Sequence, residues 1–316
     1  MPETGPLFVS SGDLIADRRY KFALDLAGRE DFAAAAELLD QTVEIAPRFA
    51  TAWFALGAIR DRLGDRAGAV AAFAQARDAD PQDYHGARLQ LARLGSGEAA
   101  PAMTETYVRR LFDQYAGRYD AALTDHLNYR GPAILRAHIA EAMRAAGRPE
   151  HFASMLDLGC GTGLAGSAFR PLVDRLTGVD LSPAMIEQAK TKGIYDRLEC
   201  ASLTDFLAAE IGADARYDLA IAADVFVYVN DIAPVIAGIA RILAPGGVLA
   251  FTVETHPGDG VLLLPTLRFA YGEAYLLAVL IQVGFDVLEL SQAAVRTEKG
   301  VPVSGLVAVA QAVSDH

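Results

Sequence analysis

Short apolar runs alternate with longer amphipathic segments through the second half of the chain. Seven such runs predict strands, near 154–158, 175–180, 197–201, 217–223, 247–254, 285–291 and 302–311. Helix-length segments separate the first six, and right-handed crossovers of this kind produce a mostly parallel sheet. The last two runs are joined without a helix, so the seventh strand is expected to be antiparallel.

A glycine-dense turn follows the first of these strands. Residues 157–163 read Asp-Leu-Gly-Cys-Gly-Thr-Gly and lead into a helix-like segment, and Asp180 ends the second strand. Glycine permits positive φ and a close approach of the backbone to a ligand, and free N–H groups of the following helix suit a carboxylate or phosphate. Asp180 can accept two ribose hydroxyls. The unit predicts a site for an adenosine-containing cofactor at the carboxyl edge of the sheet.

The identity of that cofactor stays open at this point. Residues 161–166 also satisfy G-x-G-x-x-G, which is compatible with a nicotinamide dinucleotide or with a plain tight turn. Asp157 lies just before the glycines, where its carboxylate would repel a pyrophosphate. In that position it is suited to orienting the loop or to meeting a ligand ammonium.

Two further segments complete a recognisable set. The apolar stretch 217–229 carries Asp224, and Leu-Ala-Pro-Gly-Gly at 243–247 precedes the fifth strand. With these, residues 152–312 resemble the class I S-adenosylmethionine-dependent methyltransferases. More specifically, the chain is similar to a bacterial group of predicted methyltransferases with an N-terminal tetratricopeptide region.

The resemblance implies a Rossmann-like seven-stranded α/β sheet, with S-adenosylmethionine as methyl donor and S-adenosylhomocysteine as product. It places the methionine part at the glycine loop, the ribose at Asp180 and the adenine near residues 202–205. The cofactor residues implied are Asp157, Gly159, Cys160, Gly161, Thr162, Gly163, Asp180, Leu181, Met185, Ser202, Leu203 and Asp224.

Residues 1–95 are repetitive. Pro47 and Pro81 are 34 residues apart, and the residues before Pro81 follow the tetratricopeptide pattern: Trp53, Leu56, Gly57, Ala69, Phe73 and Ala76. A weaker copy precedes Pro47, and residues 83–95 are expected to cap the stack. A generic alanine-rich bundle is the alternative. Two repeats seldom hold themselves together, so scaffolding or homodimerisation is favoured over recruitment of a protein partner.

A linker is expected at 96–103, followed by the methyltransferase domain at 104–316. Thr104 is a suitable N-cap for a helix to about residue 119, and residues 127–132 begin a second helix, with Pro132 in its first turn. In similar methyltransferases such helices, here 104–147, form a lid over the cofactor. Tyr107, Phe112, Tyr115 and Tyr119 then line the cofactor site, and ordinary core packing of an aromatic stripe is the alternative.

Composition narrows the setting. The first residues lack the basic and apolar pattern of a signal peptide, and the run at 219–229 is too short for a membrane span, so a cytoplasmic location is expected. Two cysteines are too few for a disulfide framework or a zinc site. Residues 1–95 carry 11 basic and 14 acidic side chains and the remainder 17 and 26, which disfavours a nucleic-acid substrate.

The sequence indicates the methyl acceptor less clearly than the cofactor. A neutral thioether leaves from the sulfonium, so no general acid is needed, and alignment in a dry site supplies much of the rate. The expected acceptor residues follow strands four and five: Tyr228, Glu254, His256 as the best base, and Arg268 as a clamp for an anionic group. In the resembling group a histidine stands at the position of Tyr271, so here a hydrogen bond or an aromatic wall is expected. Arg296 and Glu298 follow the group's pattern between the last two strands.

The leading interpretation is methyl transfer to a small-molecule metabolite or natural product. A protein methyltransferase recruited by the repeats, a non-catalytic scaffold and a nicotinamide oxidoreductase are the alternatives, in that order. The intact glycines, Asp157 and Asp180 disfavour a scaffold.

Overall fold

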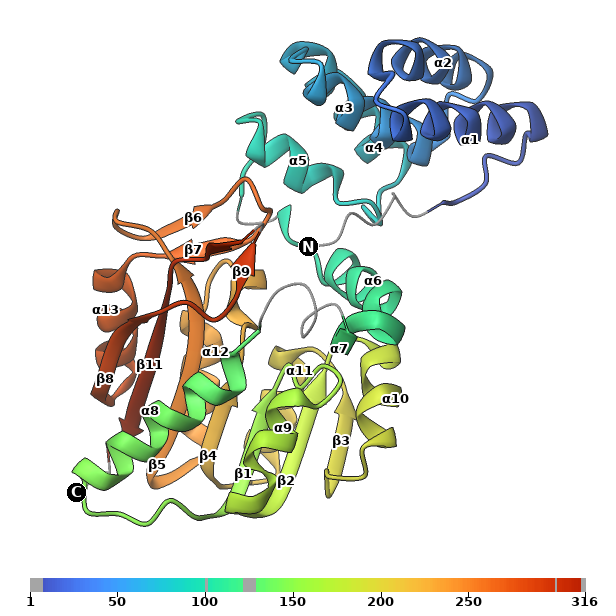
Figure 1. The fold of residues 1–316 in the computed structure, drawn as a ribbon. Helices are drawn as coiled ribbons and strands as arrows, with labels where there is room; N and C mark the ends of the chain where they lie inside the picture. Colours follow the sequence, from blue (N-terminus) through green and yellow to red (C-terminus); the bar gives the residue numbers. More distant parts are fainter. Residues whose placement is uncertain (1–7, 100–101, 122–128, 299, 314–316) are drawn as a thin grey trace. The chain divides into compact units, whose positions relative to one another are not determined.

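The computed structural model describes residues 8–99, 102–121, 129–298 and 300–313 (Figure 1). The chain divides into two compact units, Met1–Tyr107 and Val108–His316. The division falls after Tyr107, so the described residues of the expected linker, 96–99 and 102–103, belong to the amino-terminal unit. Ala100 and Pro101 lie outside the described residues. Each unit has its own hydrophobic core.

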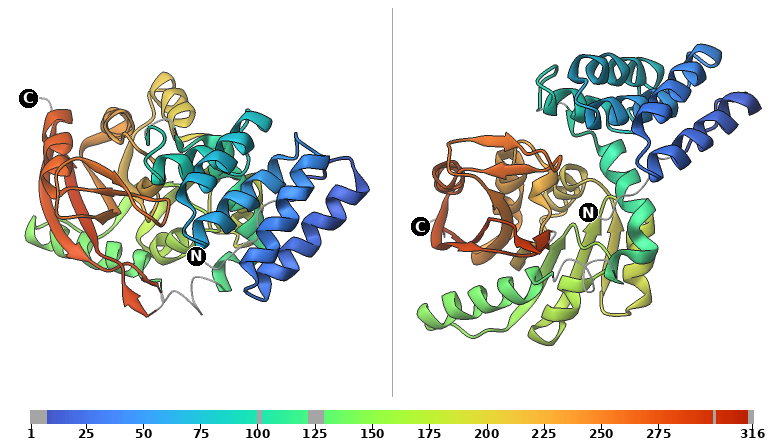
Figure 2. Two further views of the ribbon diagram at one scale, coloured as in Figure 1. Left: turned by 90° about the horizontal axis from the view of Figure 1, so that it is seen from above. Right: turned by 45° about the horizontal axis from the view of Figure 1, so that its top comes forward.

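Helical hairpins build the amino-terminal unit (Figure 2). The helices are α1 Leu14–Gly28, α2 Phe32–Ile45, α3 Ala50–Arg62, α4 Arg66–Ala79 and α5 Ala87–Arg93. Asp13, Asp31 and Asp65 cap α1, α2 and α4 by accepting backbone N–H groups in the first turn. Gly57 lets α3 and α4 approach closely, because a Cβ there would lie 2.8 Å from the ring of Phe73.

A mixed sheet forms the centre of the carboxy-terminal unit, in the order β3-β2-β1-β4-β5-β11-β8. These strands are β1 Phe152–Leu158, β2 Val173–Asp180, β3 Arg197–Cys200, β4 Tyr217–Ala222, β5 Leu243–Thr255, β8 Phe285–Ala293 and β11 Gly305–Ala312. β1 to β5 pair in parallel, and β11 is antiparallel to both β5 and β8, as predicted. The predicted count of seven was wrong, because β6 Val261–Leu263 and β7 Phe269–Tyr271 extend the sheet to nine strands.

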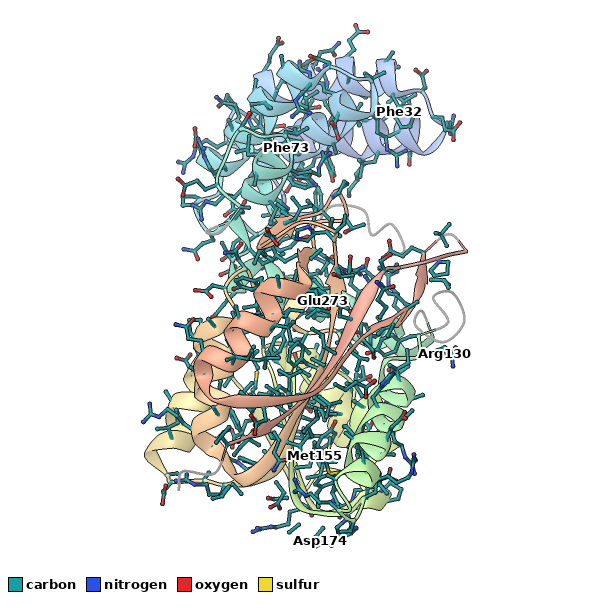
Figure 3. The ribbon with its side chains drawn as sticks, turned by 90° about the vertical axis from the view of Figure 1, so that its left-hand side faces the viewer. Phe32, Phe73, Arg130, Met155, Asp174 and Glu273 are labelled. Atoms are coloured by element: carbon teal, nitrogen blue, oxygen red, sulfur yellow. The ribbon has the colours of Figure 1, made fainter. Side chains whose placement is uncertain are left out.

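Helices cover both faces of this sheet. α8 Gly131–Ala145 and α9 Leu164–Phe169 pack on one face, and α10 Pro183–Thr191 packs beside β2 and β3. α11 Leu203–Gly212, α12 Ala233–Ile242 and α13 Glu273–Val283 cover the other face. Figure 3 shows α8, which begins after Arg130, and α13, which begins at Glu273, on opposite sides of the sheet, with Met155 between them in the core.

Two connections depart from regular α/β crossovers. The short strands β9 Thr297–Glu298 and β10 Val301–Pro302 form a hairpin between β8 and β11, where the sequence pattern had extended the last strand.

The predicted first lid helix is α6 Glu105–Tyr115, followed by a 3₁₀ turn and α7 Tyr119–Ala121. The Thr104 hydroxyl accepts the Tyr107 N–H at 3.1 Å and caps α6 as expected. Leu127 and Asn128, at the start of the second predicted lid helix, lie outside the described residues. None of the helices described has both the length and the apolar character needed to cross a membrane.

Candidate functional site

The glycine loop and Asp180 meet at the carboxyl ends of β1 and β2, at the upper edge of the sheet in Figure 1. Gly159, Gly161 and Gly163 all have positive φ, which makes this turn unfavourable for residues with a Cβ. Asp180 accepts the Gly161 N–H at 2.9 Å and the Ser182 N–H at 2.8 Å. A carboxylate has about four lone-pair sites, so Asp180 supports the loop and keeps acceptor capacity for ribose hydroxyls.

Asp157 lies beneath the loop rather than on its surface. The residue is 1% exposed, and one carboxylate oxygen accepts the Tyr195 hydroxyl at 2.7 Å. The other, Oδ1, has no hydrogen-bond partner among the described residues. Burial raises the pKa of Asp157 to about 7, and the bond from Tyr195 opposes this shift. Burial also raises the pKa of Asp180, to about 6.

The segment from α6 to α7 is tied to the cofactor loops by two acidic residues. Asp113 accepts the Ser182 hydroxyl at 2.5 Å. Asp120 accepts the Thr162 hydroxyl and pairs with Lys192 at 2.9 Å. The segment from α6 to α7 therefore contacts both loops that follow β1 and β2, through polar groups that sequence reasoning did not select. Helical spacing could not have found them, because Asp113 and Asp120 lie in different helices, α6 and α7, separated by a 3₁₀ turn.

The four aromatic residues predicted to line the cofactor site separate into three environments. A Cβ on Gly161 would lie 3.9 Å from the ring of Tyr119, which therefore faces the glycine loop. Phe112 makes edge contacts with Tyr119 and Tyr228, at centroid distances of 6.1 and 5.1 Å. Tyr115 is buried against Met185, so this pair forms core packing between the lid and α10.

The remaining aromatic candidate, Tyr107, lies in the amino-terminal unit. Its ring fills the space beside Gly86, where an added Cβ would lie 2.6 Å from a ring carbon. The structure thus explains Tyr107 as packing within the helical unit.

Other cofactor candidates occupy loop and cap positions. Ser202 caps α11 by accepting the Asp205 N–H at 3.1 Å, with Leu203 as the first helical residue. The Leu181 carbonyl accepts the Nε–H of Arg109 at 3.3 Å. Cys160 is buried and its thiol pKa is raised by burial, so it is a packed loop residue. All four follow the carboxyl ends of β1, β2 or β3.

A buried cluster of two arginines and three carboxylates lies beyond β4 and β5. Arg296 donates through Nη1 to both oxygens of Asp224 at 2.8 Å, through Nη2 to Glu254, and through Nε to Glu298 at 3.3 Å. Arg268 Nη1 donates to Glu298 at 2.6 Å and lies 3.4 Å from Glu254. We call these five residues the ionic cluster. Their formal charges sum to −1. Burial acts to lower the pKa of both arginines, but Tyr228 and the carboxylates beside Arg268, and the carboxylates beside Arg296, raise the pKa overall.

The cluster changes the interpretation of two predicted residues. Arg268 was expected to clamp an anionic acceptor, but its guanidinium is bound by internal carboxylates, and its Nε donates to Tyr228 at 3.3 Å. Asp224 was expected to contact the cofactor, but both of its oxygens are held by Arg296. The arginine side chains are 1% and 5% exposed, whereas those of Asp224 and Glu298 are 15% and 25% exposed, so carboxylates form the accessible side of the cluster.

Tyr271 and His256 do not join this group. The Tyr271 hydroxyl faces the carbonyls of Phe226, at 2.6 Å, and Val229, so it supports the backbone after β4. His256 Nδ1 accepts the Gly258 N–H at 3.1 Å, which places the ring proton on Nε2, 3.3 Å from the Gly260 carbonyl. Both ring nitrogens are engaged by the histidine's own loop, which disfavours the prediction that His256 is the base.

His256 instead lines a cavity of about 750 Å³ beside α13. Thr255, Glu273 and Gln292 also line this cavity. Glu254 belongs to the ionic cluster, whereas Thr255, the next residue of β5, lines the cavity, because successive side chains of a strand point to opposite faces.

Comparisons with known proteins agree with this geometry. Residues 156–249 match the family model described as "Methyltransferase domain". Methyltransferase-like protein 27 of Homo sapiens is 31% identical over 171 residues, which cover 53% of this chain and 65% of that protein. Malonyl-[acyl-carrier protein] O-methyltransferase of Salmonella typhimurium is 32% identical over 147 residues, 45% of this chain and 53% of that protein. The chain thus spans between half and two thirds of the length of these relatives.

Solved structures show the same fold. Magnesium protoporphyrin IX methyltransferase from Synechocystis PCC 6803, with bound SAH, superposes with a TM-score of 0.51 at 16% identity, covering 66% of this chain and 99% of that one. At this identity the likeness concerns the fold alone.

Proposed function

We propose that this chain is an S-adenosylmethionine-dependent methyltransferase that methylates a small-molecule acceptor at the carboxyl edge of β1, β2, β4 and β5. The match of residues 156–249 to a methyltransferase domain supports this proposal. The observation that carries the proposal is the glycine loop supported by Asp180. Two backbone N–H groups hold the carboxylate in place, and its remaining lone pairs suit the two hydroxyls of a ribose.

The residues present fit this cofactor. S-adenosylmethionine supplies a methyl group on a sulfonium, whose departure as a neutral thioether requires no proton. The Gly159–Gly163 backbone allows close approach of the methionine part. The rings of Tyr119 and Phe112, together with Asp180, present π faces and negative charge suited to a cation.

The acceptor is proposed to lie beside Phe112 and Tyr228, near the accessible carboxylates of the ionic cluster. Phe112 lies between Tyr119, which faces the glycine loop, and Tyr228, which contacts Arg268. This arrangement supplies an apolar wall for orienting a small molecule and excluding water. Arg268 acts there by positioning Tyr228, not by binding an anionic substrate.

Calorimetric titration with S-adenosylmethionine, S-adenosylhomocysteine and NAD tests the cofactor assignment. We expect micromolar binding of the first two and none of NAD. A metabolite screen that detects formation of S-adenosylhomocysteine then tests the acceptor class. Binding of NAD alone would overturn the proposal, and turnover only with a protein substrate would favour a protein methyltransferase.

We further propose that α1–α4 are two tetratricopeptide repeats with a scaffolding or dimerising role. The 34-residue spacing of Pro47 and Pro81, the helical hairpins and the contact between Gly57 and Phe73 support this. Sedimentation analysis of the full chain tests dimerisation. A monomer over the micromolar range would leave scaffolding or a protein partner as the role of the repeats.

A further inference from the structure

Tyr195, in the loop between α10 and β3, occupies a space created by glycines around the cofactor loop. An added Cβ would lie 2.7 Å from its ring at Gly178 and 3.0 Å at Gly163, and that of Gly166 would lie 2.5 Å from ring carbon Cζ. These glycines belong to β2, the cofactor loop and α9. The ring of Tyr195 therefore fits between β2, the cofactor loop and α9, because each of them has a glycine at the point facing the ring.

The hydroxyl of Tyr195 donates a hydrogen bond to the Asp157 carboxylate at 2.7 Å, directly before the glycine loop. Burial, and then the adjacent Asp157, raise the pKa of Tyr195 far above its ordinary value. The hydroxyl therefore stays protonated and is the donor in the hydrogen bond to the carboxylate. Asp157 is the last polar residue of β1 before Gly159, so this bond joins the start of the glycine loop to a residue 38 positions later.

We propose that Tyr195 is a positioning residue for the cofactor: its ring sets the spacing of β2, α9 and the glycine loop, and its hydroxyl orients the Asp157 carboxylate beneath that loop. The inference rests on the proposed function, since it concerns affinity for S-adenosylmethionine. The proposal assigns a role in cofactor binding to Tyr195, which lies outside the glycine motif at 157–163. Replacement of the hydroxyl should weaken cofactor binding more than it slows turnover at saturating cofactor.

Several groups face Asp157 and would share in its titration. They are the Tyr195 hydroxyl, the Gly166 N–H and Asp180, with Cys160 and Tyr129 further away. Of these, the Tyr195 hydroxyl and the Gly166 N–H favour the ionised carboxylate, whereas Asp180 disfavours it. Removing the hydroxyl should therefore move the titration of Asp157 to higher pH.

The test is Tyr195→Phe, with Tyr217→Phe as a matched control. Tyr217 donates to the buried carboxylate of Glu210 at 2.6 Å, at the opposite end of the sheet from the glycine loop. Both variants lose a hydrogen bond between a tyrosine and a carboxylate. We expect Tyr195→Phe to raise the Kd for S-adenosylhomocysteine at least tenfold, and to move the midpoint of its pH dependence upward. Tyr217→Phe should stay within twofold of the wild type.

A second variant reaches the same contact from another side. Gly166→Ala introduces a methyl group where the Tyr195 ring lies, without altering Tyr195 or Asp157, and alanine is favourable in a helix. It should also raise the Kd at least tenfold in folded protein. Unchanged affinity in both Tyr195→Phe and Gly166→Ala, with a wild type that binds, would overturn this inference alone. A wild type that binds neither S-adenosylmethionine nor S-adenosylhomocysteine would overturn the proposed function, and this inference with it.

Discussion

Replacement of Arg296 by methionine tests whether the ionic cluster holds the acceptor side of the domain together. The guanidinium is 1% exposed and donates to Asp224, Glu254 and Glu298. Methionine keeps much of the length and apolar stem but removes every donor. Glu254, itself 2% exposed, would then retain only the 3.4 Å contact with Arg268, and Asp224 would lose both bonds to Arg296.

Breaking a buried ion pair by removing one partner costs about 3–5 kcal/mol, because an uncompensated charge stays buried. For a unit of this size each kcal/mol lowers the melting temperature by about 2–4 °C. We therefore expect Arg296→Met to melt roughly 6–20 °C below the wild type at pH 7.

The assay is thermal unfolding at pH 7, followed by circular dichroism. Trp53, the only tryptophan, reports on the amino-terminal unit and separates its unfolding from that of the sheet. Arg170→Met is the control, since Arg170 pairs with Asp196 at 3.0 Å on the surface, where both side chains are at least 34% exposed. A surface pair contributes about 0–1 kcal/mol. A loss in Arg296→Met no larger than in this control would refute the reasoning.

Four other substitutions follow from the structure. Asp180→Asn should raise the Kd for S-adenosylmethionine roughly ten- to hundredfold, since hydrogen bonds to charged groups contribute about 1.5–3 kcal/mol; calorimetry at pH 7.5 would detect an unchanged affinity, which would exclude the ribose assignment. The raised pKa of Asp157 means that the folded state favours the protonated acid, so the wild type loses stability as pH rises from about 4 to about 7. Asp157→Asn should not show this loss. Denaturant unfolding should therefore give the variant a higher free energy of unfolding than the wild type at pH 8, and no such gain at pH 4. His256→Ala should leave turnover within about twofold, because neither ring nitrogen is free to accept a proton; a large fall in kcat at saturating substrate would restore it as the base. Gly57→Ala should destabilise the helical unit by about 1–3 kcal/mol through overpacking against Phe73. Denaturant unfolding followed by Trp53 fluorescence measures this loss, and an unchanged unfolding midpoint would contradict the close contact.

The sequence by itself determined the parts of this protein that depend on neighbours along the chain. The glycine loop was predictable because Gly159, Gly161 and Gly163 must supply positive φ within five residues. Asp180 was placed beside the loop because parallel strands end at the same edge of a sheet. The antiparallel last strand followed from the lack of room for a crossover helix. The capping role of Thr104 is equally local.

Only the tertiary structure decided which side chains form an ion pair or a hydrogen bond with one another. Arg296 meets Asp224 across 72 residues, and Tyr195 meets Asp157 across 38. Hydrophobic periodicity shows that a residue is buried, but not which partner it meets, because that depends on how loops from several strands pack together. The same limit explains why the contacts of His256, which follows β5 in sequence, could not be predicted: its ring nitrogens hydrogen-bond within its own loop. Partner choice is a property of the packed domain, whereas loop conformation and strand order are specified by short stretches of chain.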